Sequence, residues 1–135
     1  MNEQELKTRT RQFALRMLKV VDALPQTNSG RIIANQLGRA GTSVGANYRA
    51  ACRSRSTAEM FSKLAIVEEE ADETEYWLDM AGAHEVMTVK KLAPLRKEAG
   101  ELVAIMVASQ KTLRRKHPQR RGSAPIQNPE SKIQN

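Results

Sequence analysis

Apolar positions recur at alternating steps of four and three residues along four long stretches of the chain. This spacing places side chains on one face of an α-helix, so it predicts four amphipathic helices. They should cover about residues 6–24, 31–52, 56–82 and 93–116. The stripes expected to face the core are Leu6, Thr10, Phe13, Met17, Val20 and Leu24; Ile33, Leu37, Ala40, Val44, Asn47 and Ala51; Phe61, Leu64, Glu68, Ala71, Glu75 and Leu78; and Leu95, Ala99, Leu102, Met106, Ser109 and Leu113.

Helix-starting and helix-ending residues separate these stretches. Pro25 should end the first helix, because the residue before a proline is disfavoured in helical conformation. Ser56 with Glu59 fits the capping box of the third helix, and Gly82 stands where a C-terminal glycine is common. Pro94 suits the first turn of a helix, so the fourth helix should begin beside it, after a short turn.

Four such helices with short connections predict an all-α fold, an antiparallel up-down-up-down four-helix bundle over residues 1–116. Residues 117–135 hold three prolines and almost no apolar side chain. We expect this segment to be a disordered basic C-terminal tail.

Composition indicates the setting in which the protein works. The chain has 135 residues, a formal charge of +7 and one cysteine, Cys52. A single cysteine excludes an internal disulfide and fits a reducing compartment. The N-terminus is too polar for a secretory signal, and no apolar run approaches the roughly 20 residues of a membrane span. We therefore expect a soluble cytoplasmic protein without membrane association.

Charge is segregated along the chain. Residues 1–55 hold ten Lys or Arg and three Asp or Glu, a net charge of +7. Residues 56–110 hold five and eleven, a net charge of −6, and residues 111–135 hold seven and one, a net charge of +6. Segregated charge of this kind is typical of chains that contact polyanions, oppositely charged surfaces or copies of themselves.

A line of small residues runs along the second helix beside its apolar stripe. It includes Gly38, Gly41 and Gly45. Each glycine costs about 1 kcal/mol relative to alanine inside a helix. Three on one face indicate that another helix approaches closely there, either inside the bundle or between protomers. The alternative is a weak, locally kinked helix.

Arg39, Arg49 and Arg53 form a stripe on a neighbouring face of the second helix. The guanidinium fork matches phosphate bidentately, so this stripe is a candidate nucleic-acid contact. Alternatively, the arginines pair with the acidic third helix of the same chain or of another copy.

One amide and two carboxylate side chains fall on the expected core stripes, and a tryptophan lies beside them. A buried amide needs partners, so we expect Asn47 to fix the packing register rather than to contact a ligand. One or both of Glu68 and Glu75 should meet an arginine in a bundle or protomer interface, because a buried charge without a partner is costly. Trp77 lies just off the third stripe, and we group it with these packing or oligomer residues.

No pattern typical of catalysis or metal binding stands out. Di-iron bundles combine Glu with Glu-x-x-His, a motif that neither His84 nor His117 completes. Cys52 has no histidine close in sequence, and GRAGTSVG lacks the lysine of a phosphate-binding loop. We expect no enzyme activity, no cofactor and no metal.

The segment Lys111–Arg121 is the strongest electrostatic feature. Clustered positive charge on a flexible segment binds nucleic acid by releasing counterions. The alternative is a solvated tail that only keeps the protein in solution. No aromatic residue interleaves the segment, so we expect backbone contacts rather than base stacking. Its cations are Lys111, Arg114, Arg115, Lys116, Arg120 and Arg121.

The run from Gln36 to Leu78 resembles the four-helix-bundle family of 23S ribosomal RNA intervening-sequence proteins. The similarity extends over residues 15–116. The chain departs from the family's commoner N-I-A-E by having N-Y-R-A at Asn47–Ala50. The matching residues are Leu37, Arg39 and Ala40; Ser43, Val44 and Asn47; Arg53 or Arg55 with Ser56 and Phe61; and Glu70, Glu73 and Trp77.

This resemblance implies a homo-oligomer, specifically a homopentameric ring, without catalytic activity. The chain is also similar to the accessory proteins of diversity-generating retroelements, whose basic pentameric bundles bind nucleic acid and a reverse transcriptase. Together with the basic segments, the resemblance predicts a non-enzymatic, oligomeric nucleic-acid-binding protein, with RNA as the expected ligand. The alternative is an adaptor ring for a protein partner such as a reverse transcriptase or another polymerase.

Overall fold

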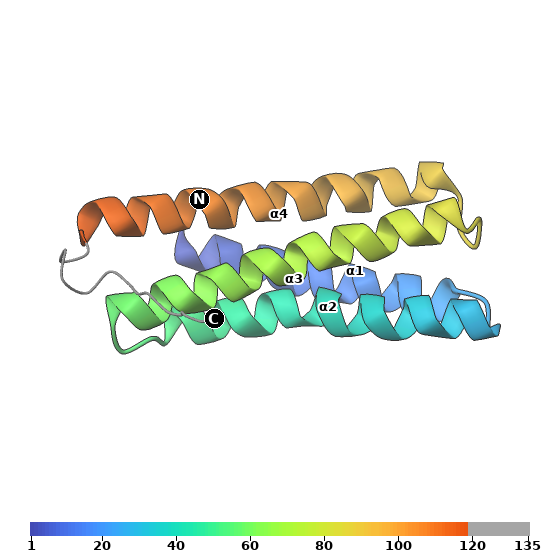
Figure 1. Cartoon of the computed structure of the whole chain (residues 1–135), viewed down its shortest axis with the longest axis horizontal. Coiled ribbons are helices and arrows are strands. Elements are labelled where there is room, and N and C mark those ends of the chain that lie inside the picture. Colours follow the sequence, from blue (N-terminus) through green and yellow to red (C-terminus); the bar gives the residue numbers. More distant parts are fainter. Residues whose placement is uncertain (119–135) are drawn as a thin grey trace, which may run out of the picture.

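The computed structural model describes residues 1–118. Consecutive helices run antiparallel and lie side by side along the long axis of the molecule (Figure 1). This arrangement confirms the predicted all-α up-down-up-down bundle, whereas residues 119–135 of the predicted tail lie outside the described residues. The helices are α1 (Glu3–Ala23), α2 (Asn28–Cys52), α3 (Thr57–Ala83) and α4 (Val89–Lys116).

Polar side chains cap the starts of α2 and α3. The Thr27 hydroxyl accepts a hydrogen bond from the Gly30 amide at 3.0 Å, and α2 therefore begins at Asn28, earlier than predicted. The Ser56 hydroxyl caps α3 by accepting from the Glu59 amide at 3.0 Å. The Glu59 carboxylate reaches back to a neighbouring amide N–H rather than to that of the cap, so the predicted capping box is present only in part.

The fourth helix begins at Val89, so the predicted start beside Pro94 is wrong. The Thr88 hydroxyl caps α4 by accepting from the Lys91 amide at 3.3 Å. Pro94 lies inside the helix on its exposed side. A proline there leaves the carbonyl of Lys90 without a helical partner, but Lys90 is itself exposed and water can satisfy that carbonyl.

A Schellman turn ends α3, and Gly82 is not its terminal residue. Glu85 adopts the left-handed conformation at φ 60°. The Val86 amide donates to the Ala81 carbonyl at 3.1 Å, and the Glu85 amide donates to the Gly82 carbonyl at 3.0 Å. Gly82 lies within the helix, where a Cβ would stand 3.3 Å from Leu92 Cδ1. Its small size therefore makes room for the start of α4.

The core is built almost entirely from aliphatic side chains. Phe13 is 1% exposed, and Met17, Leu37, Leu102 and Met106 have no exposed surface. The six positions of the first predicted stripe are all buried, five on α1 and Leu24 directly after its last residue. A helix face this uniform is what the four-and-three spacing predicts.

Leu64, Ala71 and Leu78 of α3 are buried as predicted, but the two glutamate positions of that stripe are each wrong by one residue. Val67 and Thr74 have no exposed surface, whereas Glu68 and Glu75 are half-buried at the edge of the core. The Thr74 hydroxyl donates to the Glu70 carbonyl at 2.7 Å. The prediction that both glutamates face the core is wrong, because a threonine satisfies its hydroxyl within its own helix whereas a buried carboxylate needs an external donor.

The three glycines in the middle of α2 face α1 inside the bundle. A Cβ at Gly41 would stand 2.4 Å from Met17 Cγ, and one at Gly45 would stand 3.2 Å from the Thr10 carbonyl oxygen. Gly38 has more room, with its nearest neighbouring atom at 3.4 Å. The close approach predicted from the sequence is therefore between α1 and α2 of one chain, and α2 is continuous across the glycines.

An ion-pair cluster joins α1 to α4. Arg9 binds Glu98 through two hydrogen bonds, from Nε at 2.7 Å and from Nη2 at 2.8 Å. The same Nη2 lies 2.6 Å from Glu101 Oε1. Bidentate guanidinium–carboxylate pairs are stronger than ordinary surface ion pairs, so this cluster helps to hold the first and last helices together.

Stability should fall in acid in a way that depends on Glu98. The hydrogen bond from Arg9 holds the pKa of Glu98 below its ordinary value. The unfolded carboxyl therefore takes up a proton at a higher pH than the folded one, and the stabilisation present at neutral pH is lost as the pH falls below about 5. Chemical denaturation of Glu98→Gln should show a weaker decline in the free energy of unfolding between about pH 5 and 3 than the parent. Equal declines would contradict this role.

Candidate nucleic-acid interface

The alternating helix directions bring two distant basic segments to one end of the bundle. The C-terminal ends of α2 and α4 lie together there, beside the start of α3 (Figure 1). The Lys and Arg side chains of these two segments are all exposed, and none of them forms an ion pair within residues 1–118. We call this surface the basic end, and its cations are Arg49, Arg53, Arg55, Lys111, Arg114, Arg115 and Lys116.

The helix dipoles stabilise some of the cations at the basic end. Arg49 lies in the last turn of α2, and Arg114, Arg115 and Lys116 lie in the last turn of α4. A cation near a helix C-terminus contributes about 0.3–1 kcal/mol at an exposed site. The same effect does not explain Lys111, which stands before the last turn. The remaining positive charge is available for an anionic partner.

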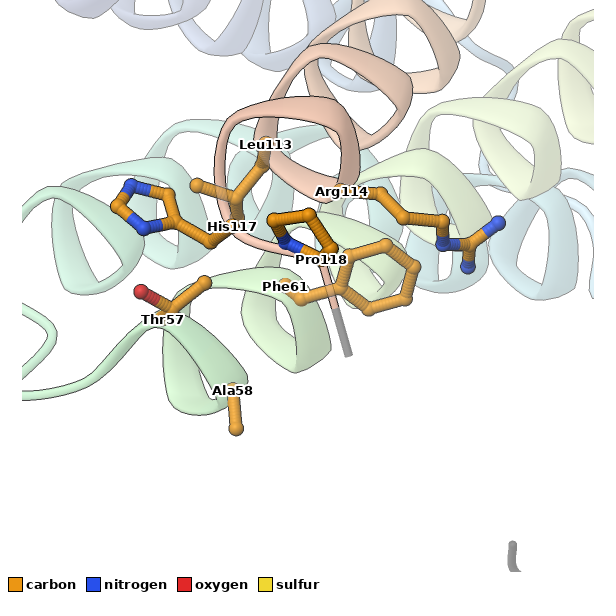
Figure 2. A pocket seen from close by; sticks show the side chains of 7 residues that line it. All are labelled: Thr57, Ala58, Phe61, Leu113, Arg114, His117 and Pro118. Atoms are coloured by element: carbon orange, nitrogen blue, oxygen red, sulfur yellow. The ribbon is translucent and has the colours of Figure 1, made fainter. Parts of the chain in front are cut away.

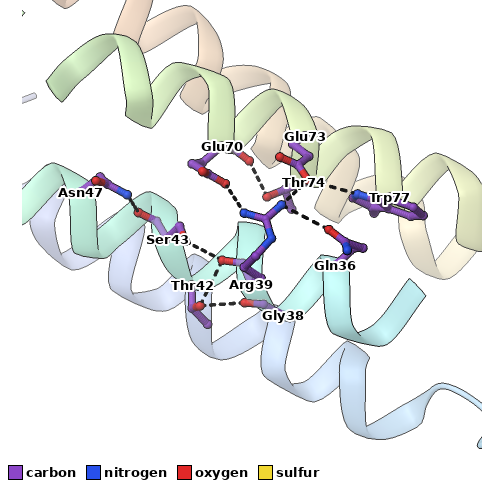
Figure 3. Close-up of polar contacts among 10 residues, drawn as sticks. All are labelled: Gln36, Gly38, Arg39, Thr42, Ser43, Asn47, Glu70, Glu73, Thr74 and Trp77. Atoms are coloured by element: carbon purple, nitrogen blue, oxygen red, sulfur yellow. Dashed lines mark hydrogen bonds and ion pairs between the residues drawn. The ribbon is translucent and has the colours of Figure 1, made fainter. Parts of the chain in front are cut away.

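The three arginines of the α2 stripe have different surroundings. Arg39 pairs with α3, whereas the other two form no ion pair among the described residues. Figure 3 shows Arg39 reaching from α2 to α3, where its guanidinium pairs with Glu73 and, at 3.3 Å, with Glu70. The predicted pairing with the acidic third helix therefore describes Arg39. Arg49 and Arg53 lie at the basic end and form no such pair among the described residues. Arg39 is not placed to be a free phosphate ligand.

Trp77 belongs to the Arg39 network. Its Nε1 donates to Glu73 at 3.4 Å, which is the carboxylate that also pairs with Arg39 (Figure 3). Its half-buried ring meets Tyr76 edge to face, with ring centroids 5.1 Å apart. Trp77 therefore packs beside the α2–α3 seam, and Tyr76 remains 52% exposed on the acidic helix.

Asn47 bonds within its own helix. It is half-buried, and its amide nitrogen donates to the Ser43 carbonyl at 2.9 Å (Figure 3). Tyr48, the next residue, takes the buried place that the periodicity assigned to Asn47. The expected role in fixing the register between helices has no supporting hydrogen bond among the described residues, because the side chain satisfies itself locally.

The two glutamates expected to need partners both have them. Glu75 lies 2.6 Å from Arg96 of α4, and the same guanidinium lies 3.1 Å from Asp79. Glu68 accepts from the Gln110 amide at 2.7 Å instead of from an arginine. These contacts join α3 to α4 inside one chain.

A pocket of about 370 Å³ lies at the basic end between the start of α3 and the end of α4 (Figure 2). The Arg114 guanidinium stands 4.7 Å from the centre of the Phe61 ring. This cation–π contact holds the last turn of α4 near α3 and orients one cation of the basic end. The pocket is lined by Thr57, Ala58, Phe61, Leu113, Arg114, His117 and Pro118.

A second hollow, of about 490 Å³, lies between α1 and α2. Lys7 and Arg11 of α1 line it together with Arg49 of α2. We did not predict Lys7 and Arg11 as binding residues from the sequence. Their spacing of four residues, each directly after a residue of the apolar stripe, was the available signal, and it does not by itself separate a binding face from a solvated one.

Cys52 does not have the character of a reactive thiol. It is half-buried, and burial raises the pKa of its thiol above the ordinary value. Burial likewise raises the pKa of the neighbouring Tyr48 hydroxyl. A raised pKa keeps the thiol in its protonated, less nucleophilic form near neutral pH.

Two predicted binding residues, Arg120 and Arg121, lie outside the described residues. The other predicted cations of the segment Lys111–Arg121, which are Lys111 and Arg114 to Lys116, stand on α4. Among residues 1–118, no three His, Cys, Asp or Glu side chains converge as metal ligands would. None of the helices in this part of the chain has the length and apolar character needed to cross a bilayer.

These features define a class of protein, a four-helix bundle with segregated charge and a strongly positive end. The model of the 23S rRNA-intervening sequence protein family matches residues 2–108. The chain belongs to that family, which confirms the resemblance found in the sequence.

A solved structure has the same architecture. It is the crystal structure of a protein of unknown function from the S23 ribosomal protein family of Bacteroides thetaiotaomicron VPI-5482. The two chains are 30% identical, with a TM-score of 0.77, and the match covers 82% of this chain and 99% of that one. No curated protein matches this chain.

Proposed function

We propose that this protein is a non-enzymatic, oligomeric bundle that acts in the cytoplasm and binds nucleic acid, with RNA as its ligand. The observation that carries the proposal is the convergence of cations from two helices at one end, without ion pairs among the described residues. Such clusters bind phosphate backbones by releasing counterions, largely without regard to sequence. The family's description refers to 23S rRNA, which supports RNA as the ligand.

Self-association, with a ring of five copies, is part of this proposal. Leu15, Leu18 and Ile32 are 41%, 44% and 58% exposed, which supports apolar contacts between copies. Several copies would present several basic ends, and weak individual contacts then gain from multivalency. An oligomer should scatter light with a mass several times the 15.1 kDa of one chain.

Neutralising three cations of the basic end should weaken RNA binding strongly. The triple variant Arg114→Gln, Arg115→Gln, Lys116→Gln removes three candidate phosphate contacts from α4. For single-stranded RNA, the loss should be about 100-fold at 0.1 M salt, and the slope of log affinity against log salt should become shallower by about 2. Fluorescence anisotropy with a labelled RNA measures both quantities.

The same helix offers a matched control at its other end. Lys90→Gln, Lys91→Gln, Lys97→Gln removes the same charge from exposed positions near the start of α4. This control should retain affinity within about threefold, since those residues lie away from the basic end. Equal losses in both triple variants would show that only net charge matters and would contradict a localised interface.

The acidic outer surface of α3 favours a second candidate function, a protein adaptor. Glu69, Asp72 and Asp79 are exposed there, and Tyr76 stands among them. An aromatic residue framed by acids is suited to a basic protein surface such as that of a reverse transcriptase or another polymerase. In that case RNA should fail to compete with the partner, whereas competition would indicate that both use the basic end.

A further inference from the structure

The hollow between α1 and α2, which we call the α1–α2 groove, is lined along several turns of both helices. On α1 its lining runs from Gln4 to Ala14, and on α2 from Thr42 to Arg49. Ten residues of helix rise about 15 Å, so the groove extends over several turns of α1. Because the helices are antiparallel, Arg49 lies toward the same end of the bundle as Gln4, and Arg49 is itself one of the cations of the basic end.

Small residues form the floor of this groove. Gly45 is buried, and a Cβ there would stand 3.2 Å from the Thr10 carbonyl oxygen of α1. Ala14 and Ala46 line the groove on the two helices. The glycine that lets α1 approach α2 therefore also keeps the space between them open to a ligand.

Cations stand on both walls of the groove. Lys7 and Arg11 come from successive turns of α1, and Arg49 comes from α2. Arg11 and Arg49 form no ion pair among residues 1–118. Lys7 lies 3.3 Å from Glu3, an exposed pair four residues apart that is weak and open to exchange. No acidic residue lines the groove itself.

Neutral donors add to this lining. Gln4 and Thr8 line the groove from α1, and the Thr8 hydroxyl has no hydrogen-bond partner among the described residues. The Thr42 hydroxyl donates to the Gly38 carbonyl at 2.7 Å, so its proton is already used. Lys, Arg, Thr and Gln side chains are the usual donors to phosphate oxygens. No aromatic residue lines the groove, so it offers no platform on which a base could stack.

We propose that the α1–α2 groove binds the sugar–phosphate backbone of a single nucleic-acid strand, with Lys7 and Arg11 on one side of the strand and Arg49 on the other. This inference rests on the proposed function and deepens it by assigning a second binding surface, continuous with the basic end. Since the contacts are to phosphates, the site should accept RNA and DNA of any sequence.

The double variant Lys7→Gln, Arg11→Gln tests the groove, since both residues line it and neither belongs to the basic end. Labelled oligouridylate RNA and its deoxy counterpart are titrated in fluorescence anisotropy at several salt concentrations. Both strands should bind about 25-fold more weakly at 0.1 M salt, and the salt slope should become shallower by about 1.4. Arg16→Gln, Lys19→Gln is the matched control on exposed positions of α1 outside the groove, and it should retain affinity within about threefold.

The outcomes separate this inference from the proposed function. If the parent protein binds neither strand, both fail. If the parent binds and the groove variant binds equally well, or no worse than the control variant, only the groove is overturned. Binding of RNA alone would indicate recognition of the 2′-hydroxyl and would contradict a site that contacts phosphates only. A changed mass of the groove variant in light scattering would show that the groove is a contact between copies, which also overturns the inference.

Discussion

Replacing Phe13 with alanine should lower the free energy of unfolding by about 3–5 kcal/mol. Phe13 is 1% exposed, and it is the largest of the fully buried side chains. Its removal deletes a large apolar surface from the core and leaves a cavity that rigid neighbouring helices cannot fill. A domain of this size is stable by about 5–15 kcal/mol, so the variant should lose a large part of its stability. Urea denaturation followed by the helical circular dichroism signal measures the change.

The chain contains a natural control for this substitution, because its only other phenylalanine is Phe61. Phe61 is half-buried at the basic end, where it contacts the Arg114 guanidinium. Phe61→Ala should cost about 1 kcal/mol, since it loses a partly solvated cation–π contact and little core packing. Similar losses for the two variants would contradict the placement of Phe13 at the centre of the core.

Introducing leucine at Gly41 should lower the free energy of unfolding by about 3 kcal/mol. A Cβ at this position would stand 2.4 Å from Cγ and 2.8 Å from Cβ of Met17, which has no exposed surface. Neither atom is at the free end of the methionine side chain, so α1 must move away from α2. The separation would also loosen the packing around Gly45. Thermal and urea unfolding both measure the loss.

Gly100→Leu is the control for this overpacking. Gly100 is exposed on α4, and a Cβ there would meet nothing within 4 Å. Leucine should raise the free energy of unfolding by about 0.5–1 kcal/mol, because glycine is unfavourable inside a helix. In addition, Gly41→Leu combined with Met17→Ala should be more stable than the sum of the two single losses indicates, since one side chain fills the space of the other. Additive losses would show that Gly41 and Met17 are not in conflict.

Periodicity predicted the helices well but not all of their ends. Spacing predicted the buried face of α1 completely. When apolar residues lie on one side of a helix and polar residues on the other, only one face can turn toward the core. The start of α4 was wrong because Thr88 caps a helix that tolerates Pro94 on its exposed side. The role of Gly82 as the glycine that ends α3 was wrong, because Glu85 adopts the left-handed conformation that glycine usually occupies there. The preferences of single residues indicate the commoner way to begin or end a helix, and both of these helix ends use a less common one.

The binding surface was predicted less completely than the fold. Arg39, Arg49 and Arg53 share a helix face, and their sequence spacing cannot distinguish them. Only the packing of α2 against α3 shows that Arg39 is held by carboxylates while the other two stand free of such pairs in the described chain. The groove residues were missed for the same reason, since a groove is made by two helices and the sequence of either one shows only a charged face.

The dependence of RNA affinity on salt tests the role of the basic end most directly. Fluorescence anisotropy of the parent protein with labelled single-stranded RNA gives the affinity at each salt concentration. If several cations of the basic end contact phosphates, log affinity should fall linearly with log salt, with a slope of about −3 or steeper. An affinity that salt leaves unchanged, or no binding at low salt, would contradict the interface.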